Sequence, residues 1–330
     1  MDDFSNYIVG AYATSPTLIN WDPAKETDFM LGLRQRLGTI RGLELPFWGN
    51  GIHPYDAKLF LSLLNPDWEY VLTCLPGNMQ SIAKNKHFGL ASDDEGGRRE
   101  ALNFYKNACE SINIVNQYFG SRRVFAVAIA TSPALNVDGV SSSMTALEAS
   151  LLTLASFDWS GAKLVIEHCD SGRLTEKVAK GFLSIEEELM CISNLSNRHG
   201  VDVGMTINWG RSVIEVRDEI GANQHILKAL HVGALCGLMF SGTSSADSIY
   251  GQWSDLHLPI AEEPEIDHFE KSSLMTASHM KSCLIDSNFK DLDYLGVKLL
   301  SMPIESSSLE RRIGVNFDAL RVLNRIIEEL

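Results

Sequence analysis

The chain has 330 residues, of which 45% are hydrophobic and 21% are charged, so it is long enough to bury a substantial core. Its formal net charge of −14 is the opposite of the basic surface typical of nucleic-acid-binding proteins. No apolar run is long enough to span a bilayer. We therefore expect a globular protein that binds neither nucleic acid nor a membrane.

The six cysteines are scattered along the chain and show no metal-knuckle or CxxC spacing. In a chain of this size, this pattern predicts reduced and mostly buried thiols, as in cytoplasmic proteins. The acidic start, Met-Asp-Asp-Phe-Ser-Asn, lacks the basic and apolar segments of a signal peptide. We expect a cytoplasmic protein, and the sequence leaves open whether it forms a homo-oligomer.

Eight short runs rich in apolar or β-branched residues predict strands. They cover Tyr7–Ala13, Gly42–Phe47, Tyr70–Cys74, Val124–Ala130, Lys163–His168, Val201–Asn208, Leu235–Ser241 and Val297–Met302. Segments with helical character lie between and after them, at Ala24–Leu37, Tyr55–Leu64, Arg98–Phe119, Met144–Phe157, Ser184–Arg198, Ser212–Val232, Ser272–Ser287 and Ser307–Leu330.

This eightfold alternation predicts an α/β fold, a single (β/α)8 TIM barrel that spans residues 1–330 as one domain. An open doubly wound sheet is the rival, but no GxGxxG turn follows the first strand. Two connections, 131–143 after the fourth strand and 242–267 after the seventh, are longer than a plain barrel needs. They are either binding loops at the carboxyl rim or tolerated surface insertions.

The fifth predicted strand ends in ionisable residues, which is how parallel α/β proteins build sites. Glu167 continues the face of Val165, whereas His168 points to the opposite face and is expected to pack on helices. Asp170 follows directly. We expect Glu167 to be catalytic.

Glu44 lies in the middle of the apolar run Gly-Leu-Glu-Leu-Pro. A carboxylate buried there has to be paired, ligate a cation or bind a hydroxyl group, because burying it alone is costly. The alternatives are a catalytic role beside Glu167 and an internal ion pair with a strand lysine or arginine.

Four further residues are candidates for binding. His53, in a glycine-rich turn, either binds substrate or is a polar turn residue. Arg211 opens a predicted helix, where it suits an anionic or polar substrate end. Its alternative partner is Glu215, at helical i,i+4 spacing. Asp255 and His257 alternate in the loop after the seventh strand, where they could hold a metal ion, although a DxH pair is common by chance.

Several aromatic residues fall at the predicted rim rather than in helix stripes: Trp48, Trp209, Tyr250 and Trp253. Flat aromatic faces beside fixed polar groups suit the apolar face and the hydroxyl groups of a sugar. Core packing is the alternative for each of them singly. No Walker loop, HExxH or GxSxG motif is present, so no nucleotide cofactor is expected.

The segments IVGAYATSP, GLELPFWGNGIHP, VIEHCD, TINWGRSVIE and GLMFSG resemble a bacterial branch of the xylose-isomerase-like TIM barrels. That superfamily contains sugar isomerases and epimerases. The resemblance runs from the first to the seventh strand, and it implies a barrel that acts on a small sugar or sugar derivative.

The resemblance also implies where a divalent metal (Mg, Mn or Zn) would lie: a Glu on strand five, an Asp on strand six, a His on strand seven and a Glu on strand eight. Glu167 matches the first ligand. Asn208 stands at the Asp position, and Arg211 at that of a substrate-binding His three residues later. Strands seven and eight offer no His and no Glu, so the metal site is degenerate or absent unless Asp255 and His257 replace the missing ligands.

The sequence therefore predicts a sugar or polyol isomerase or epimerase that abstracts a proton next to a carbonyl group. Glu167 and Glu44 are its expected catalytic residues. The expected substrate-binding residues are His53, Trp48, Asn208, Trp209, Arg211 and Trp253. A glycoside hydrolase or lyase with paired carboxylates and a non-catalytic sugar-binding barrel are the alternatives.

Overall fold

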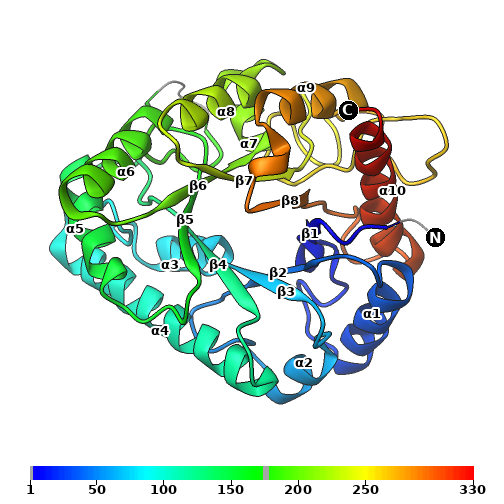
Figure 1. Cartoon of the computed structure of the whole chain (residues 1–330), viewed down its shortest axis with the longest axis horizontal. Coiled ribbons are helices and arrows are strands. Elements are labelled where there is room, and N and C mark those ends of the chain that lie inside the picture. Colours follow the sequence, from blue (N-terminus) through cyan, green and yellow to red (C-terminus); the bar gives the residue numbers. More distant parts are fainter. Residues whose placement is uncertain (1–2, 174–177) are drawn as a thin grey trace.

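The computed structural model describes residues 3–173 and 178–330. Eight parallel strands close into a barrel in chain order, and helices surround it (Figure 1). The strands are β1 (Tyr7–Val9), β2 (Gly42–Pro46), β3 (Glu69–Thr73), β4 (Val124–Ile129), β5 (Lys163–Glu167), β6 (Gly204–Asn208), β7 (Leu235–Phe240) and β8 (Tyr294–Val297). The predicted (β/α)8 barrel is confirmed.

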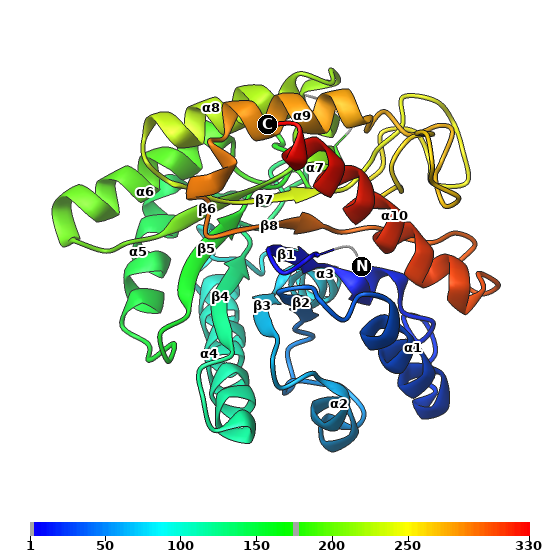
Figure 2. The ribbon, with the colours of Figure 1, turned by 45° about the vertical axis from the view of Figure 1, so that its right-hand side comes forward.

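The α-helices are α1 (Pro23–Arg36), α2 (Ala57–Leu63), α3 (Leu75–Lys84), α4 (Glu95–Phe119), α5 (Met144–Ala155), α6 (Ile185–His199), α7 (Trp209–Val216), α8 (Gly221–His231), α9 (Ala277–Asp286) and α10 (Leu309–Glu328). Two short 3₁₀ helices, η1 (Ala11–Thr14) and η2 (Phe289–Asp291), precede α1 and β8. In Figure 2 the long connection after β7 extends beside α9 and α10.

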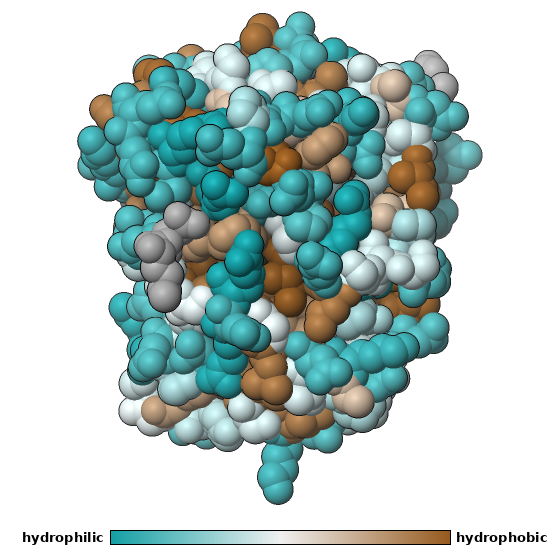
Figure 3. Space-filling view, turned by 90° about the vertical axis from the view of Figure 1, so that its right-hand side faces the viewer, coloured by the Kyte–Doolittle hydropathy of each residue, from teal (hydrophilic) through white to brown (hydrophobic). Residues whose placement is uncertain are grey.

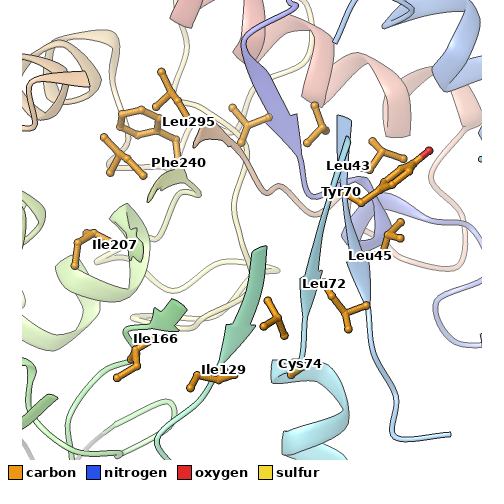
Figure 4. Packing of buried hydrophobic residues seen from close by; sticks show 14 of the residues in the cluster. Leu43, Leu45, Tyr70, Leu72, Cys74, Ile129, Ile166, Ile207, Phe240 and Leu295 are labelled. Atoms are coloured by element: carbon orange, nitrogen blue, oxygen red, sulfur yellow. The ribbon is translucent and has the colours of Figure 1, made fainter. Parts of the chain in front are cut away.

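Strand alternation divides the core into two parts. Leu43 and Leu45 of β2 and Leu72 of β3 belong to the large cluster that packs the strands against the helices (Figure 4). Residues of the opposite parity, such as Val71 and Val165, belong to a separate small cluster inside the barrel. Glu44 and Glu167 share the inward parity, because Glu44 pairs with Val71 and Glu167 lies two residues after Val165.

Local sequence explains most of the element boundaries. The capping box expected at the start of α6 is present, with Ser184 and Glu187 each bonding the other's backbone N–H. Helix α3 lies outside the predicted helices, and its proline lies in the first helical turn, where no N–H is needed. β8 ends at Val297, where the predicted strand began, so Lys298 lies at the rim.

The remaining surface and thiol features agree with a globular chain. All six cysteines are free and buried, as expected. No helix within 3–173 and 178–330 is both long and apolar enough to cross a membrane. The face in Figure 3 is mostly hydrophilic, with hydrophobic residues in small groups.

Candidate active site

Six charged residues meet at the carboxyl rim of the barrel, and we call them the rim ion cluster: Glu44, Glu167, Asp255, Lys180, Arg211 and Lys298. Lys298 is fully buried, and its Nζ lies 3.0 Å from Oε2 of Glu44 and 2.6 Å from Oε1 of Glu167. The ammonium group therefore bridges the two carboxylates. The internal ion pair that the sequence offered as one alternative for Glu44 is confirmed.

Arg211 connects this bridge to the loop after β7. Its Nη1 lies 2.6 Å from Oε1 of Glu167, and its Nε donates to Oδ2 of Asp255 at 3.0 Å. Lys180 contacts the same Asp255 oxygen at 3.0 Å. The suggested salt bridge between Arg211 and Glu215 is wrong, because Arg211 turns into the barrel.

Gly10, at the end of β1, makes room for the bridge between Glu44 and Lys298. A Cβ atom at this position would lie 2.7 Å from Oε2 of Glu44 and 2.8 Å from Cγ of Lys298. Contacts this short do not occur for real Cβ atoms, so an alanine here would push the ion pair apart. The absence of a side chain at Gly10, directly after β1, thus leaves room for this ion pair.

The two bridged carboxylates differ in their acidity. For Glu167, burial opposes ionisation, but Arg211 and Lys298 outweigh it and lower the pKa to about 2. For Glu44, burial outweighs Lys298, and with the negative charge of Glu167 it raises the pKa to about 7. Glu167 is consequently a fixed charge, whereas Glu44 can exchange a proton near neutral pH.

Lys298 is held as a cation by its partners. Burial favours its neutral form, but Glu167 and Glu44 outweigh burial and raise the pKa of Lys298 above its usual range. An amine that stays protonated cannot attack a carbonyl carbon, so the residue supplies charge rather than a nucleophile.

A cavity of about 330 Å³ opens beside the cluster at the ends of β1 and β2. Glu44 and Tyr12 line it next to the bridge, since Nζ of Lys298 lies 5.9 Å from the centroid of the Tyr12 ring. Burial raises the pKa of the Tyr12 phenol, so its hydroxyl stays protonated and can donate a hydrogen bond. The cavity is thus lined by a residue that can accept a proton, Glu44, and by one that can donate a hydrogen bond, Tyr12.

Aromatic residues form much of the remaining cavity wall. Trp21 and Tyr55 stack with ring centroids 5.3 Å apart, and Trp48 also lines the cavity. Nδ1 of His53 accepts the backbone N–H of Asp56 at 2.9 Å, and its Nε2 lies 3.3 Å from Oε1 of Glu26. The predicted residues His53 and Trp48 therefore lie at one cavity with Glu44.

Other predicted binding residues lie elsewhere. Trp209 is fully buried in the core, where it stacks on His279 with ring centroids 5.9 Å apart. The Arg217 guanidinium lies over the Trp253 ring, with its Cζ atom 5.0 Å from the ring centroid. Oδ1 of Asn208 accepts the Ser241 hydroxyl at 2.7 Å, while its Nδ2 is buried without a partner among the described residues. None of these three lines the cavity.

The donor groups at the rim do not fit a divalent cation. Oε1 of Glu167 is contacted by both Lys298 and Arg211, its Oε2 accepts from the Thr73 hydroxyl, and Asp255 is held by Arg211 and Lys180. His257 lies 3.4 Å from Asp255, and burial lowers its pKa to about 3. Three cationic side chains already neutralise the three carboxylates, so a metal ion would meet uncompensated positive charge.

His168, Glu215 and His225 form a second group whose ligand atoms lie within 4.8 Å of one another, compatible in composition with a metal site. Both nitrogens of His168 are already engaged, Nδ1 by Glu188 at 2.7 Å and Nε2 by Glu215 at 3.0 Å. As predicted, His168 faces the helices, here α6 and α7, and it anchors them to the end of β5.

This buried arrangement predicts a pH-dependent stability. Burial disfavours the imidazolium of His168, but Glu188 and Glu215 outweigh it and raise the pKa to about 10. The contribution of His168 to the free energy of unfolding is therefore complete below its pKa in the unfolded chain, about 6.5, and it is lost as pH rises through its pKa in the folded protein. At pH 6, we expect His168→Gln to lower the free energy of unfolding by about 3–5 kcal/mol. Urea denaturation at increasing pH should show the gap to wild type narrowing, and a constant gap would contradict this explanation.

Sequence reasoning missed several residues of the site. Lys298 carried a usable signal, because a lysine directly after an apolar strand requires a buried partner. Tyr12, Trp21, Tyr55, Glu26 and Lys180 gave no such signal, since they come from helix α1 and from three different connections that only folding brings to the rim.

The fold is a TIM barrel, and it is similar to solved structures described as a xylose isomerase domain protein and a xylose isomerase-like TIM barrel. The chain belongs to the family described as a domain of unknown function, DUF4862, whose model matches residues 8–315. It is 33% identical over 327 residues to the Salmonella typhimurium protein STM3670, which is described as uncharacterized. That alignment covers 98% of this chain and 99% of the Salmonella protein.

Solved structures with the same fold are more distant in sequence. The IolI protein with a bound zinc atom is 13% identical, with a TM-score of 0.57 over 97% of this chain and 98% of that one. An L-ribulose 3-epimerase is 13% identical, with a TM-score of 0.59 over 99% and 97%. A putative sugar phosphate isomerase/epimerase of Anabaena variabilis is 14% identical, with a TM-score of 0.55 over 100% and 99%. At these identities the likeness concerns the fold.

Proposed function

We propose that this protein is a sugar or polyol isomerase or epimerase that transfers a proton next to a carbonyl group. The observation that carries the proposal is Glu44: a carboxylate with a pKa of about 7, bridged by Lys298 and lining an aromatic cavity at the rim. Such a pKa gives a base that is ionised in part at neutral pH and can also return the proton.

The reaction uses groups at the cavity in distinct roles. Glu44 removes the proton from the carbon next to the carbonyl, and the electron pair moves to the carbonyl oxygen to give an enediolate. The protonated Tyr12 hydroxyl donates a hydrogen bond to that oxygen. For isomerisation, Glu44 returns the proton to the carbonyl carbon, and the proton of the adjacent hydroxyl group moves to the former carbonyl oxygen. For epimerisation, water on the opposite face gives a proton to the original carbon, the electron pair returns from the oxygen to re-form the carbonyl, and Glu44 releases its proton to solvent.

The two predicted catalytic carboxylates thus receive different roles. Glu44 acts as the base, whereas Glu167 holds Lys298 and Arg211 in place and keeps the charge of the cluster balanced.

A glycoside hydrolase receives less support, because Lys298 rather than a substrate lies between the two carboxylates. Asp170 accepts the backbone N–H groups of Ala179 and Lys180, so it is occupied in holding the loop after β5.

Exchange in deuterium oxide tests the proposal without knowledge of the product. A panel of free aldoses and ketoses is incubated with the protein, and proton NMR follows loss of the signal next to the carbonyl. We expect exchange with at least one sugar. Binding of sugars without exchange of any of them would instead indicate the non-catalytic sugar-binding barrel.

The donor set at the rim also predicts the response to metal removal. Because three cations occupy the cluster, we expect exchange activity to survive dialysis against EDTA unchanged and not to rise when Mg²⁺, Mn²⁺ or Zn²⁺ is added. Elemental analysis of the dialysed protein monitors the metal content. Activity that disappears with EDTA and returns with one equivalent of metal would support Glu167, Asp255 and His257 as ligands.

A further inference from the structure

We propose that the cavity takes an uncharged polyhydroxy substrate and discriminates against phosphorylated and carboxylated relatives. This inference rests on the function proposed above and names the substrate class of the same cavity. It follows from two observations: the cations of the rim ion cluster are already paired with carboxylates of this chain, and the cavity is lined by carboxylates, aromatic rings and neutral polar groups.

The cations of the rim ion cluster are not available to an anionic substrate. Arg211 is 1% exposed and Lys298 is fully buried, and each contacts two carboxylates of this chain. The Lys180 side chain is 14% exposed and is paired with Asp255. A phosphate that recruited any of them would have to displace a buried carboxylate, which would then be left without its partner.

The charged residues that line the cavity also disfavour an anionic substrate. Two carboxylates, Glu26 and Glu44, line the cavity. Lys84, at the end of α3, is the one lysine or arginine among the described residues that does so, and it is exposed. An anionic group deep in the cavity would thus meet negative charge, which is a common device for rejecting a wrong ligand.

The cavity also offers the contacts that an uncharged sugar uses. The stacked pair Trp21 and Tyr55 presents flat faces, and Trp21 is fixed because its Nε1 donates to Glu26 at 2.9 Å. Asn50, Gln80 and Thr17 add neutral hydrogen-bonding groups. The volume of about 330 Å³ lies at the small end of the range of about 300–1,000 Å³ for ligand sites. It suits one monosaccharide rather than an extended chain.

Matched sugar pairs test the inference. Isothermal titration compares D-fructose with D-fructose 6-phosphate and L-ribulose with L-ribulose 5-phosphate on the full chain. We expect the free sugar of at least one pair to bind about tenfold or more tightly than its phosphate. Glu26→Gln removes one carboxylate of the wall and should narrow this ratio. The same change at Glu69, which begins β3 at the opposite end of the barrel and pairs with Arg41, should leave the ratio unchanged.

The outcomes separate this inference from the proposed function when deuterium exchange is followed in the same samples. Tighter binding of free sugars without exchange supports the inference and contradicts the function. Exchange and equal or tighter binding of the phosphate esters support the function and overturn the inference. Failure of every uncharged sugar to bind also overturns it.

Discussion

Replacing Glu44 by Gln is expected to slow proton exchange by about 10²–10⁴-fold, the usual contribution of a positioned general base. Glutamine keeps the shape of the side chain at the cavity and still accepts a hydrogen bond from Lys298, but it cannot take up a proton. Sugar affinity, measured by titration, should therefore change much less than the rate. Glu69→Gln supplies the control, because it removes one carboxylate at the far end of β3.

The pH profile provides a second measure of the same residue. Since burial and Glu167 raise the pKa of Glu44 to about 7, the ionised base accumulates as pH rises through 7. The rate constant kcat/KM should accordingly increase between about pH 6 and pH 8 and then level off. A variant that keeps wild-type exchange, or a wild-type rate that falls over this interval, would assign the base to another residue.

Replacing Lys298 by Met is expected to lower the free energy of unfolding by about 3–5 kcal/mol, the cost of breaking a buried ion pair from one side. The change leaves two buried carboxylates, Glu44 and Glu167, facing each other without the ammonium group between them. The pKa of Glu44 should rise further, because the attraction of Lys298 for its ionised form is lost.

Chemical denaturation of single and double variants measures this effect. Lys298→Met combined with Glu44→Gln should recover part of the lost stability, because it also removes one uncompensated charge. Lys163→Met is the matched control: Lys163 begins β5 and also has two acidic partners, Asp202 and Asp293, but it is partly exposed. Its loss should cost no more than about 1 kcal/mol. Equal costs at the two lysines would show that the bridge contributes little.

The position of Lys298 also explains how the barrel differs from the metal-dependent pattern that its resemblance implies. One ammonium group lies between a carboxylate of β2 and a carboxylate of β5, and Arg211 lies on the other side of Glu167. A cation built into the chain can stabilise the ionised carboxylates without a bound metal. The resemblance implies a Glu on strand eight as a metal ligand. This chain has no Glu there, and it has Lys298 directly after β8.

The sequence alone determined the barrel and the position of its rim. Strand alternation and apolar runs depend on neighbouring residues, so the eight β/α repeats and the shared face of Glu167 and Val165 could be predicted. The cost of burying a lone carboxylate also predicted that Glu44 would have a partner, although not which one.

The tertiary structure decided which residues meet. Lys298 lies 131 positions after Glu167, and Asp255 lies 44 positions after Arg211, so no local pattern could pair them. The same holds for Trp21 and Tyr55, which come from separate connections to the cavity wall. Trp209 and Trp253 were expected to bind substrate because of their place in the sequence. In the structure, Trp209 stacks on His279 and Trp253 lies under Arg217. Local sequence fixes the direction of a side chain along its own strand or helix, whereas its partners depend on the closure of the whole barrel.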